Sequence, residues 1–253
     1  MLADFLQHDV HVFLLAFARV GAAVMLLPGF GDFTVPARVR LAFALLLSLV
    51  LAPLVAPAVP AMPQDFPSLL LLLGGELAVG LIIGTVARLL MAALQVAGTV
   101  ISYNMGLGAA QLFDPSADQQ GAIASAFLTT LGVTLLFVTN LHHVMLEALA
   151  SSYSVFVPGA GLPVGDFADM AARLVGESFR LGMQIALPLT LVGVIVYVAM
   201  GLMGRLMPQI QVFFVALPIQ IVVGFAVLAA TLALGMDVFL DAFAAGLVRL
   251  TGS

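Results

Sequence analysis

Apolar stretches separated by short polar or Pro/Gly-rich breaks run through the whole chain. Several of these stretches reach about 20 residues, the length at which a helix crosses the hydrocarbon core of a bilayer. The first two are expected at about 10–27 and 41–55. The first ends at Pro28-Gly29 and the second in a group of prolines, because each proline removes a backbone N–H and disfavours helix in the residue before it.

The rest of the chain continues the same pattern, which indicates about six to eight helices in all and no soluble domain. The third and fourth segments are longer than a single crossing needs. The expected positions are 68–96 with a continuation towards Asn104, 122–150, 170–206, 212–234 and a short terminal helix at 237–250.

The scarcity of charge agrees with this pattern. Of the 253 residues, 63% are hydrophobic and 8% are charged, whereas an average soluble domain carries about 25% charged residues. So few charges cannot cover a water-facing surface, and we expect an all-α membrane protein. The net charge of −5 comes with no basic patch, which argues against nucleic-acid binding. Asp4 and Asp9 differ from the positive start of a signal peptide, which predicts a retained first helix.

Signals for catalytic chemistry are weak. The chain has no Cys, which excludes disulfides, thiol nucleophiles and cysteine metal sites. His143 and Glu147 have helical i, i+4 spacing, but a zinc protease needs two His at that spacing with a Glu between them. Gly106-Leu107-Gly108 begins a dinucleotide fingerprint that lacks its last Gly and follows no predicted strand. We therefore expect no enzyme, no catalytic residue, no cofactor and no metal.

Four residues of the third helix recur at every fourth position: Glu76, Gly80, Gly84 and Arg88. Residues four apart lie along one face of a helix. The two glycines allow another helix to approach closely, and the two charges are costly in lipid, so this face is expected to meet protein or water. The stripe is either an ion or proton path or, as we favour, a packing seam against another subunit.

The loop at 106–121 is the most unusual internal stretch. It combines flexible glycines with apolar Leu107, Leu112 and Phe113. Irregular backbone is tolerated at membrane depth only where it is buried in protein or lines a water-filled cavity. The residues alone leave two interpretations open, a constriction or plug in a pathway and a surface loop outside the bilayer.

Two stretches near the C-terminus are alike, 186–190 (Ala-Leu-Pro-Leu-Thr) and 216–220 (Ala-Leu-Pro-Ile-Gln). A glycine follows each of them shortly, Gly193 and Gly224. Internal repeats with broken helices are typical of transporters. Helices rich in Leu, Ala and Val also match by chance, so both interpretations stay open.

Short motifs spread over most of the chain match a known family in order and spacing. They are Arg19-Val20, 35–41 (Val-Pro-Ala-Arg-Val-Arg-Leu), Met105-Gly106-Leu107, Phe113-Asp114-Pro115, Asn140-Leu141-His142 and 204–213 (Gly-Arg-Leu-Met-Pro-Gln-Ile-Gln-Val-Phe). With these motifs the chain resembles the FliR family of flagellar biosynthetic proteins, which are the R or T subunits of type III secretion export gates. One departure is Gln211, where the family often has Asn.

The resemblance implies a channel-forming subunit of the flagellar export gate, in the bacterial inner membrane and the flagellar basal body. Its implied partners are the P and Q subunits, the B and A subunits, unfolded exported flagellar proteins and membrane lipid. It further implies one helical subunit over 1–253 whose long, Pro/Gly-bent helices assemble spirally with homologous subunits. Within it, a P-like part covers about 1–169 and a Q-like helical hairpin about 170–253.

The resemblance also places the central loop beside the channel, which predicts that the loop acts as a plug. The alternatives are an ion-coupled secondary transporter that uses Glu76 and Arg88, and a membrane enzyme. The predicted plug and channel residues are Met105, Gly106, Leu107, Gly108, Leu112, Phe113, Asp114 and Pro115. The predicted helix-packing or interface residues are Glu76, Gly80, Gly84, Arg88, Pro188, Pro208 and Pro218.

Overall fold

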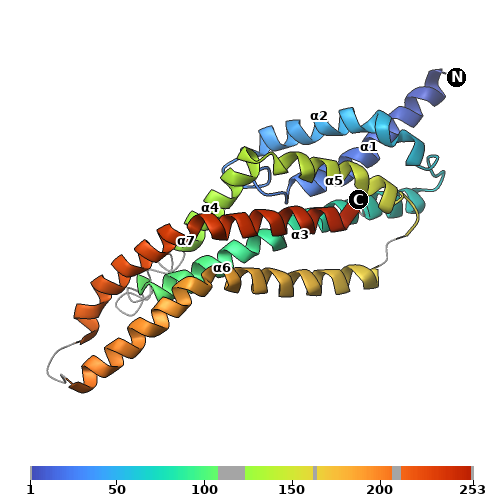
Figure 1. Cartoon of the computed structure of the whole chain (residues 1–253). Helices are drawn as coiled ribbons and strands as arrows, with labels where there is room; N and C mark the ends of the chain where they lie inside the picture. Colours follow the sequence, from blue (N-terminus) through green and yellow to red (C-terminus); the bar gives the residue numbers. More distant parts are fainter. Residues whose placement is uncertain (1, 108–122, 162–163, 207–211, 252–253) are drawn as a thin grey trace. The chain divides into compact units, whose positions relative to one another are not determined.

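The computed structural model describes residues 2–107, 123–161, 164–206 and 212–251. The described residues form helices and connecting loops, with no strand among them (Figure 1). The all-α class expected from the sequence is therefore confirmed. The elements are α1 (Leu2–Val24), α2 (Ala37–Val55), the short 3-10 helix η1 (Ala56–Ala58), α3 (Phe66–Asn104), α4 (Ile123–Val138), α5 (Leu141–Val155), α6 (Val164–Leu206) and α7 (Val212–Thr251).

Four of the described helical segments are long and apolar enough to cross a membrane, and a fifth is counted if the bent pair α4–α5 is one span. The four segments are Ala37–Ala58, Phe66–Asn104, Phe167–Leu206 and Ala216–Arg249. This confirms the expected membrane protein. α3, α6 and α7 contain 39, 43 and 40 residues. At about 1.5 Å per residue each is about twice as long as a hydrocarbon core of about 30 Å.

Local chemistry sets where α3 starts. The side chain of Asp65 accepts a hydrogen bond from the Ser68 amide at 3.0 Å and another from the Ser68 hydroxyl. These bonds satisfy donors that the first turn of a helix leaves free. The Ser68 hydroxyl, and then the Ser68 amide, hold the pKa of the Asp65 carboxyl below its ordinary value of 3.8.

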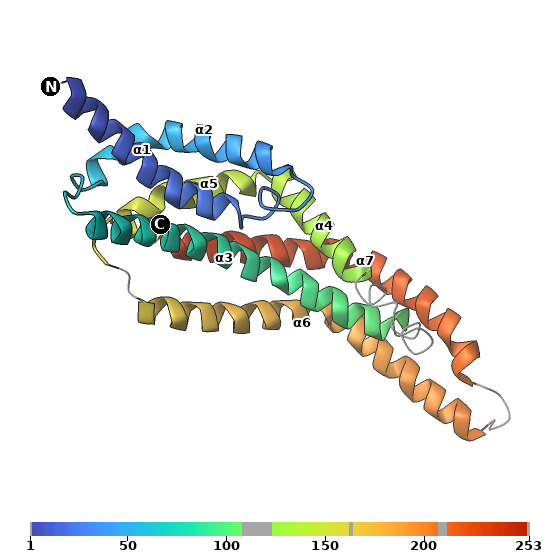
Figure 2. The same cartoon turned by 180° about the vertical axis from the view of Figure 1, so that it is seen from behind.

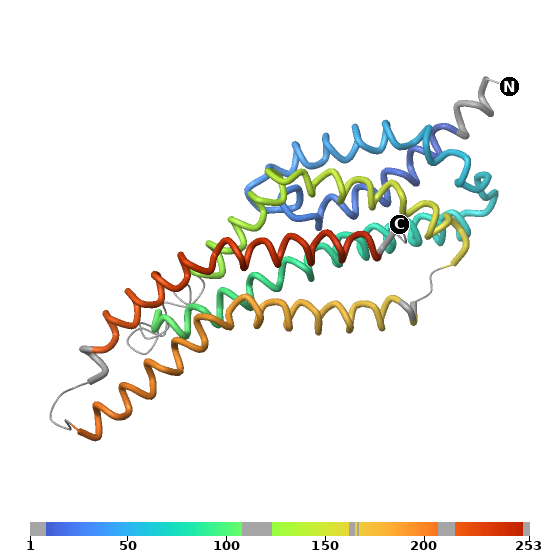
Figure 3. Tube along the Cα trace, viewed as in Figure 1, coloured from blue at the N-terminus to red at the C-terminus, as the bar shows by residue number. Residues whose placement is uncertain are grey.

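Several helix boundaries differ from the sequence prediction. α1 runs from Leu2 to Val24 instead of 10–27, and α6 begins at Val164 instead of residue 170. The predicted helix 122–150 is two helices, α4 and α5, which are bent by 76° at a short break. Asn140 at this break has a φ of 61°, a left-handed conformation that Asn tolerates better than most residues with a side chain. At the C-terminus the predicted helices 212–234 and 237–250 are one, because α7 continues unbroken to Thr251 (Figure 3).

The chain forms two compact units that interleave along the sequence. The first unit consists of 1–90, 136–175 and 243–253. Figures 1 and 2 show α1 and α2 side by side in it, with α5 next to them. One group of buried side chains includes Val20, Ala44 and Leu149, from α1, α2 and α5. A second group joins the same three helices to α3 through residues such as Leu72.

The second unit consists of 91–135 and 176–242, so it contains the C-terminal part of α3, most of α4 and large parts of α6 and α7. Small residues let these helices approach one another. A Cβ on Gly98 would lie 2.3 Å from the Ser125 backbone, and one on Gly182 would lie 2.6 Å from the Ala93 carbonyl. α6 and α7 each contain an internal proline and continue through it (Figure 3).

Large apolar side chains are exposed on several helices. Such surfaces are favourable in contact with lipid or with another protein and unfavourable in contact with water. Leu46, Leu49 and Val50 on α2 are 60–70% exposed. On α6 and α7, Ile195 and Val222 are each 68% exposed. These surfaces are covered by lipid or by other subunits in a membrane protein.

Candidate functional site

The C-terminal end of α3 is the point at which the predicted plug begins. α3 ends at Asn104, and Gly106 has a φ of 74°, which glycine adopts without the penalty of a Cβ. The Gly106 amide donates to the Tyr103 carbonyl at 3.1 Å. Met105 between them is 1% exposed. The described start of the predicted plug is therefore a buried methionine followed by a sharp turn.

Polar side chains from two other helices meet this end. The Asn104 side-chain amide donates to the Thr190 hydroxyl on α6 at 3.1 Å. Gln220 on α7 donates from Nε2 to the Asn104 backbone carbonyl at 2.7 Å, and the same Nε2 lies 3.4 Å from the Tyr197 hydroxyl. These contacts were missed by the sequence analysis, because Thr190 lies 86 and Gln220 lies 116 positions from Asn104.

An apolar cavity of about 310 Å³ lies beside the same helix end. Met105 and Leu107 contribute to its wall, and the other lining residues come from α4 and α7. Those residues are Ile123, Ala124, Phe127, Phe225, Leu228, Ala229 and Leu232. Of the predicted plug residues, Met105, Gly106 and Leu107 are thus brought together here, while Gly108, Leu112, Phe113, Asp114 and Pro115 lie outside the described residues.

The predicted glycine stripe of α3 packs against α1 of the same chain. A Cβ on Gly80 would lie 2.2 Å from the Arg19 carbonyl oxygen, and one on Gly84 would lie 2.5 Å from the Leu26 Cβ. At these distances only glycine fits without displacement of α1 or of the turn that follows it. The stripe therefore has a partner within the chain, and contact of the same residues with another subunit stays a prediction.

The two charges of the stripe have different environments. Arg88 is exposed and donates from Nε to the Leu26 carbonyl at 3.0 Å. Glu76 is 2% exposed and forms a two-pronged ion pair with Arg19 of α1. Arg19 Nε lies 2.8 Å from Glu76 Oε2, and Arg19 Nη2 lies 2.8 Å from Glu76 Oε1. Paired hydrogen bonds of this kind are the strongest arrangement between guanidinium and carboxylate.

The remaining donors of Arg19 reach α5 and the residue after it. Nη1 donates to the Ser152 hydroxyl at 3.1 Å, and Nη2 donates to the Phe156 carbonyl at 2.8 Å. The guanidinium carbon also lies 3.8 Å from the ring centroid of Tyr153, a cation–π contact. The Arg19 side chain is 0% exposed. One arginine thereby joins α1, α3 and α5, and a buried charge with this many partners is satisfied.

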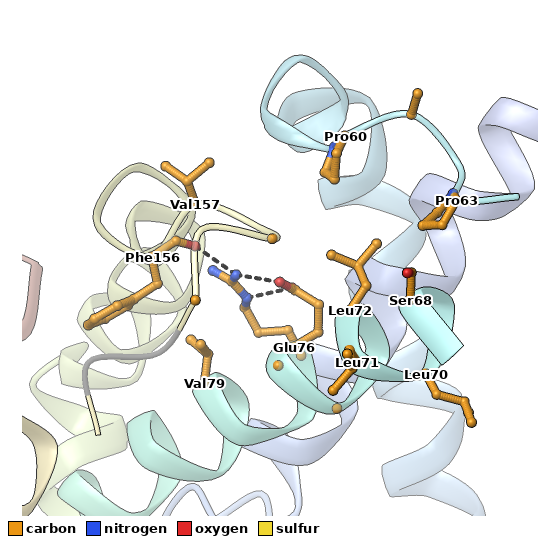
Figure 4. A pocket seen from close by; sticks show the side chains of 16 residues that line it. Pro60, Pro63, Ser68, Leu70, Leu71, Leu72, Glu76, Val79, Phe156 and Val157 are labelled. Carbon is orange, nitrogen blue, oxygen red and sulfur yellow. Dashed lines mark hydrogen bonds and ion pairs between the residues drawn. The ribbon is translucent and has the colours of Figure 1, made fainter. Parts of the chain in front are cut away.

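The ion pair borders a cavity of about 700 Å³, which Figure 4 views from close by. In the figure, two dashed lines join the Glu76 carboxylate to the guanidinium, and a third joins the guanidinium to the Phe156 carbonyl. Most of the wall is apolar and comes from the start of α3 and the two loops near it, including Pro60, Leu71 and Val157. One signal in the sequence could have indicated this site, since Arg19 is the only Asp, Glu, Lys or Arg in the predicted helix at 10–27.

The remaining candidates are the three prolines of α6, α7 and the link between them, and the adjacent pair His142 and His143. Pro188 and Pro218 lie inside α6 and α7, whereas Pro208 lies outside the described residues. The His142 ring stacks on Phe137 with centroids 4.9 Å apart, and the His143 ring lies 4.1 Å from it. Within the described part of the chain, no group of three His, Asp or Glu side chains is arranged to hold a metal ion.

Comparisons with known proteins converge on one kind of protein. Residues 10–246 match the family model described as "Bacterial export proteins, family 1". The chain is 43% identical to the flagellar biosynthetic protein FliR of Caulobacter vibrioides, over 88% of this chain and 89% of that protein. It is 32% identical to FliR of Bacillus subtilis, over 85% and 84%. It is 28% identical to the Yop proteins translocation protein T of Yersinia pestis, over 87% and 85%.

Proposed function

Because this chain belongs to the bacterial export proteins, family 1, we propose that it is a channel-forming subunit of a flagellar type III export gate. In this role it is not catalytic and conducts unfolded flagellar proteins across the bacterial inner membrane. The similarity to FliR proteins and to a Yop translocation protein supports a subunit of a type III export apparatus. The long apolar helices support its position in the membrane.

The proposed plug is the central segment from Met105 to about residue 121. The observation that carries this proposal is the start of that segment. A buried Met105 and a left-handed Gly106 end α3 beside an apolar cavity, and Leu107 lines it. A plug must block small solutes and yield to a passing chain. Apolar contacts beside a glycine turn suit this task, because local opening costs far less than global unfolding.

The proposed partners are the P and Q subunits of the gate, with the B and A subunits, in the flagellar basal body. The exposed apolar surfaces of α6 and α7 support extensive contact with such partners or with lipid, since Ile195, Val222 and Leu234 are each 68% exposed or more. The exported chains are the proposed cargo of the channel. A P-like part at about 1–169 and a Q-like hairpin at about 170–253 remain part of this proposal.

Deletion of 107–119 tests the plug. We expect the purified complex that carries the deletion to conduct ions steadily in a planar bilayer, while the unaltered complex is silent. A matched control replaces the same stretch by Gly and Ser residues of equal length, which keeps the connection but removes the apolar side chains. We expect this control to leak as well. Assembly is followed by recovery of the partner subunits, and equally silent baselines for all three complexes would contradict the plug.

The alternative is an ion-coupled secondary transporter, and the buried Glu76 beside a cavity is the observation in its favour. Both carboxylate oxygens of Glu76 accept hydrogen bonds from Arg19, however, so this carboxylate is already neutralised within the chain. Purification separates the two functions. A gate subunit is recovered with P and Q partners and behaves poorly alone, whereas a transporter is stable alone and binds a small solute.

A further inference from the structure

The end of α3 presents backbone groups that a helix cannot satisfy by itself. The last carbonyls of any helix lack an intrahelical donor, and within a bilayer no bulk water replaces it. Gly106 N–H supplies one donor, to the Tyr103 carbonyl. The carbonyl of Asn104 receives its donor from Gln220, whose side chain is 6% exposed. Gln220 therefore supplies to this helix-terminal carbonyl the hydrogen bond that water supplies at an exposed helix end.

The two contacts to Asn104 come from corresponding positions of the similar stretches 186–190 and 216–220. Thr190 and Gln220 each stand two residues after the internal proline of their helix. Thr190 accepts from the Asn104 side chain, and Gln220 donates to the Asn104 carbonyl. A chance match between apolar helices gives no reason for both polar residues to bind the same partner. The shared target favours a real structural repeat.

The glycines that follow the two stretches contact the same helix end. A Cβ on Gly193 would lie 2.6 Å from Asn104 Oδ1, and one on Gly224 would lie 2.6 Å from the Met105 Cγ. Each stretch therefore offers a polar side chain and, within four residues, a position without a side chain. The polar residue binds α3, and the glycine makes room for the side chains of Asn104 and Met105.

We propose that Thr190 and Gln220 are positioning residues that anchor the end of α3 and thereby fix where Met105, Gly106 and Leu107 lie. The proposal rests on the plug function for its importance, since these three residues begin the proposed plug. The anchor is neutral, so it breaks more readily than an ion pair does. While it is intact, the anchor opposes movement of the end of α3, because that movement would leave the buried Gln220 carboxamide without a partner.

The absence of Cys from the chain allows a direct test with pairs of spin labels. The first pair, Leu107→Cys with Ile195→Cys, measures the distance between the segment after α3 and α6. The second pair, Ile195→Cys with Val222→Cys, reports α6 against α7 at two exposed positions. Distances are measured by pulsed electron paramagnetic resonance on the full chain in its purified complex, with and without Gln220→Leu or Thr190→Val.

We expect each substitution to broaden the distance distribution of the first pair and to leave the second pair unchanged. Loss of one hydrogen bond should raise about fivefold the fraction of molecules in which the end of α3 is detached from α6 and α7. Two substitutions serve as matched controls. Thr231 on α7 donates from its hydroxyl to the Val227 carbonyl of its own helix, so Thr231→Val keeps the anchor. Gln184→Leu removes an exposed carboxamide from α6.

The results separate this anchor from the plug. An unchanged first pair in both Gln220→Leu and Thr190→Val overturns the anchor, even where deletion of 107–119 makes the complex leak. A first pair that broadens equally in the two controls also overturns it. A first pair that broadens only in the anchor variants supports it, and if the deleted complex is then silent, the plug fails while the anchor stands.

Discussion

The two compact units stabilise their buried polar groups in different ways. In the first unit, Arg19 and Glu76 form a charged pair with exposures of 0% and 2%, and the arginine also bonds to Ser152 and Phe156. In the second unit, uncharged hydrogen bonds join Asn104 to Thr190 and to Gln220, and the neighbouring Tyr197 is 51% exposed. The first arrangement surrounds one charge with several partners, whereas in the second a single neutral hydrogen bond joins Asn104 to each of Thr190 and Gln220.

This difference suggests a division of work between the units. A buried ion pair is strongly unfavourable to break, because each charge left alone in a low-dielectric interior loses both its partner and its solvation. Neutral hydrogen bonds contribute far less each. We infer that the first unit keeps α1, α3 and α5 in one arrangement. The end of α3 in the second unit is held by hydrogen bonds that cost less to break.

The largest expected effect is at the ion pair. Arg19→Met or Glu76→Leu alone leaves a buried charge without its partner and should lower the free energy of unfolding by about 3–5 kcal/mol. The double variant Arg19→Met with Glu76→Leu should recover most of this loss, since an apolar pair of similar size is often as stable as the ion pair. Denaturant titration of the purified protein in detergent measures both.

The control for this prediction is Glu147→Gln on the exposed side of α5, which should change the free energy of unfolding by less than about 0.5 kcal/mol. Single variants as stable as the parent would contradict the division between the units. So would a double variant no better than the worse single one.

A smaller effect is expected from glycine substitutions, and here the units again differ. Gly80→Ala brings a Cβ against the Arg19 backbone carbonyl at 2.2 Å, which cannot give way, and should cost about 1–3 kcal/mol. In the second unit, Gly235→Ala brings a Cβ to 3.3 Å from the Ile185 Cγ2, an overlap that a shift of a few tenths of an ångström relieves, and should cost less than about 1 kcal/mol. Thermal unfolding of the complex, together with recovery of the partner subunits, provides the measurement.

Gly74→Ala is the matched control on α3, because a Cβ there meets nothing within 4 Å. It should be neutral or stabilise by about 0.4–1 kcal/mol through the lower entropy of the unfolded chain. If Gly80→Ala and Gly74→Ala proved equally harmless, the close contact between α1 and α3 would not determine the stability of the first unit.

The smallest effect is expected at Asp65, where Asp65→Ala should fray the first turn of α3 without unfolding the unit. Because hydrogen bonds from Ser68 lower the pKa of this carboxyl, its contribution is present at neutral pH and is lost as the pH falls through that lowered value. Hydrogen exchange of the Ser68 amide should therefore accelerate in the variant at pH 7. Identical exchange in variant and parent would show that the cap is not needed.

The class of fold followed from local properties of the sequence. Apolar stretches of helical length predicted α2 and α3 to within a few residues, because helix formation and membrane immersion depend on composition along a short window. The start of α6 at Val164 was missed, because the Gly and Asp residues before 170 are typical of a loop. Breaks marked by proline or by Gly106 were also found. The break at Asn140 was missed, because an Asn in the left-handed conformation has no signal as clear as Pro or Gly.

The sequence by itself determined that this is an all-α membrane protein with family motifs in a fixed order, and it marked Glu76, Gly80 and Gly84 as one helix face. Only the tertiary structure decided what that face meets. Glu76 is paired with Arg19 across 57 positions, and Asn104 with Gln220 across 116. Such pairings depend on how whole helices pack, and a helical period specifies which residues share a face without specifying which helix covers it.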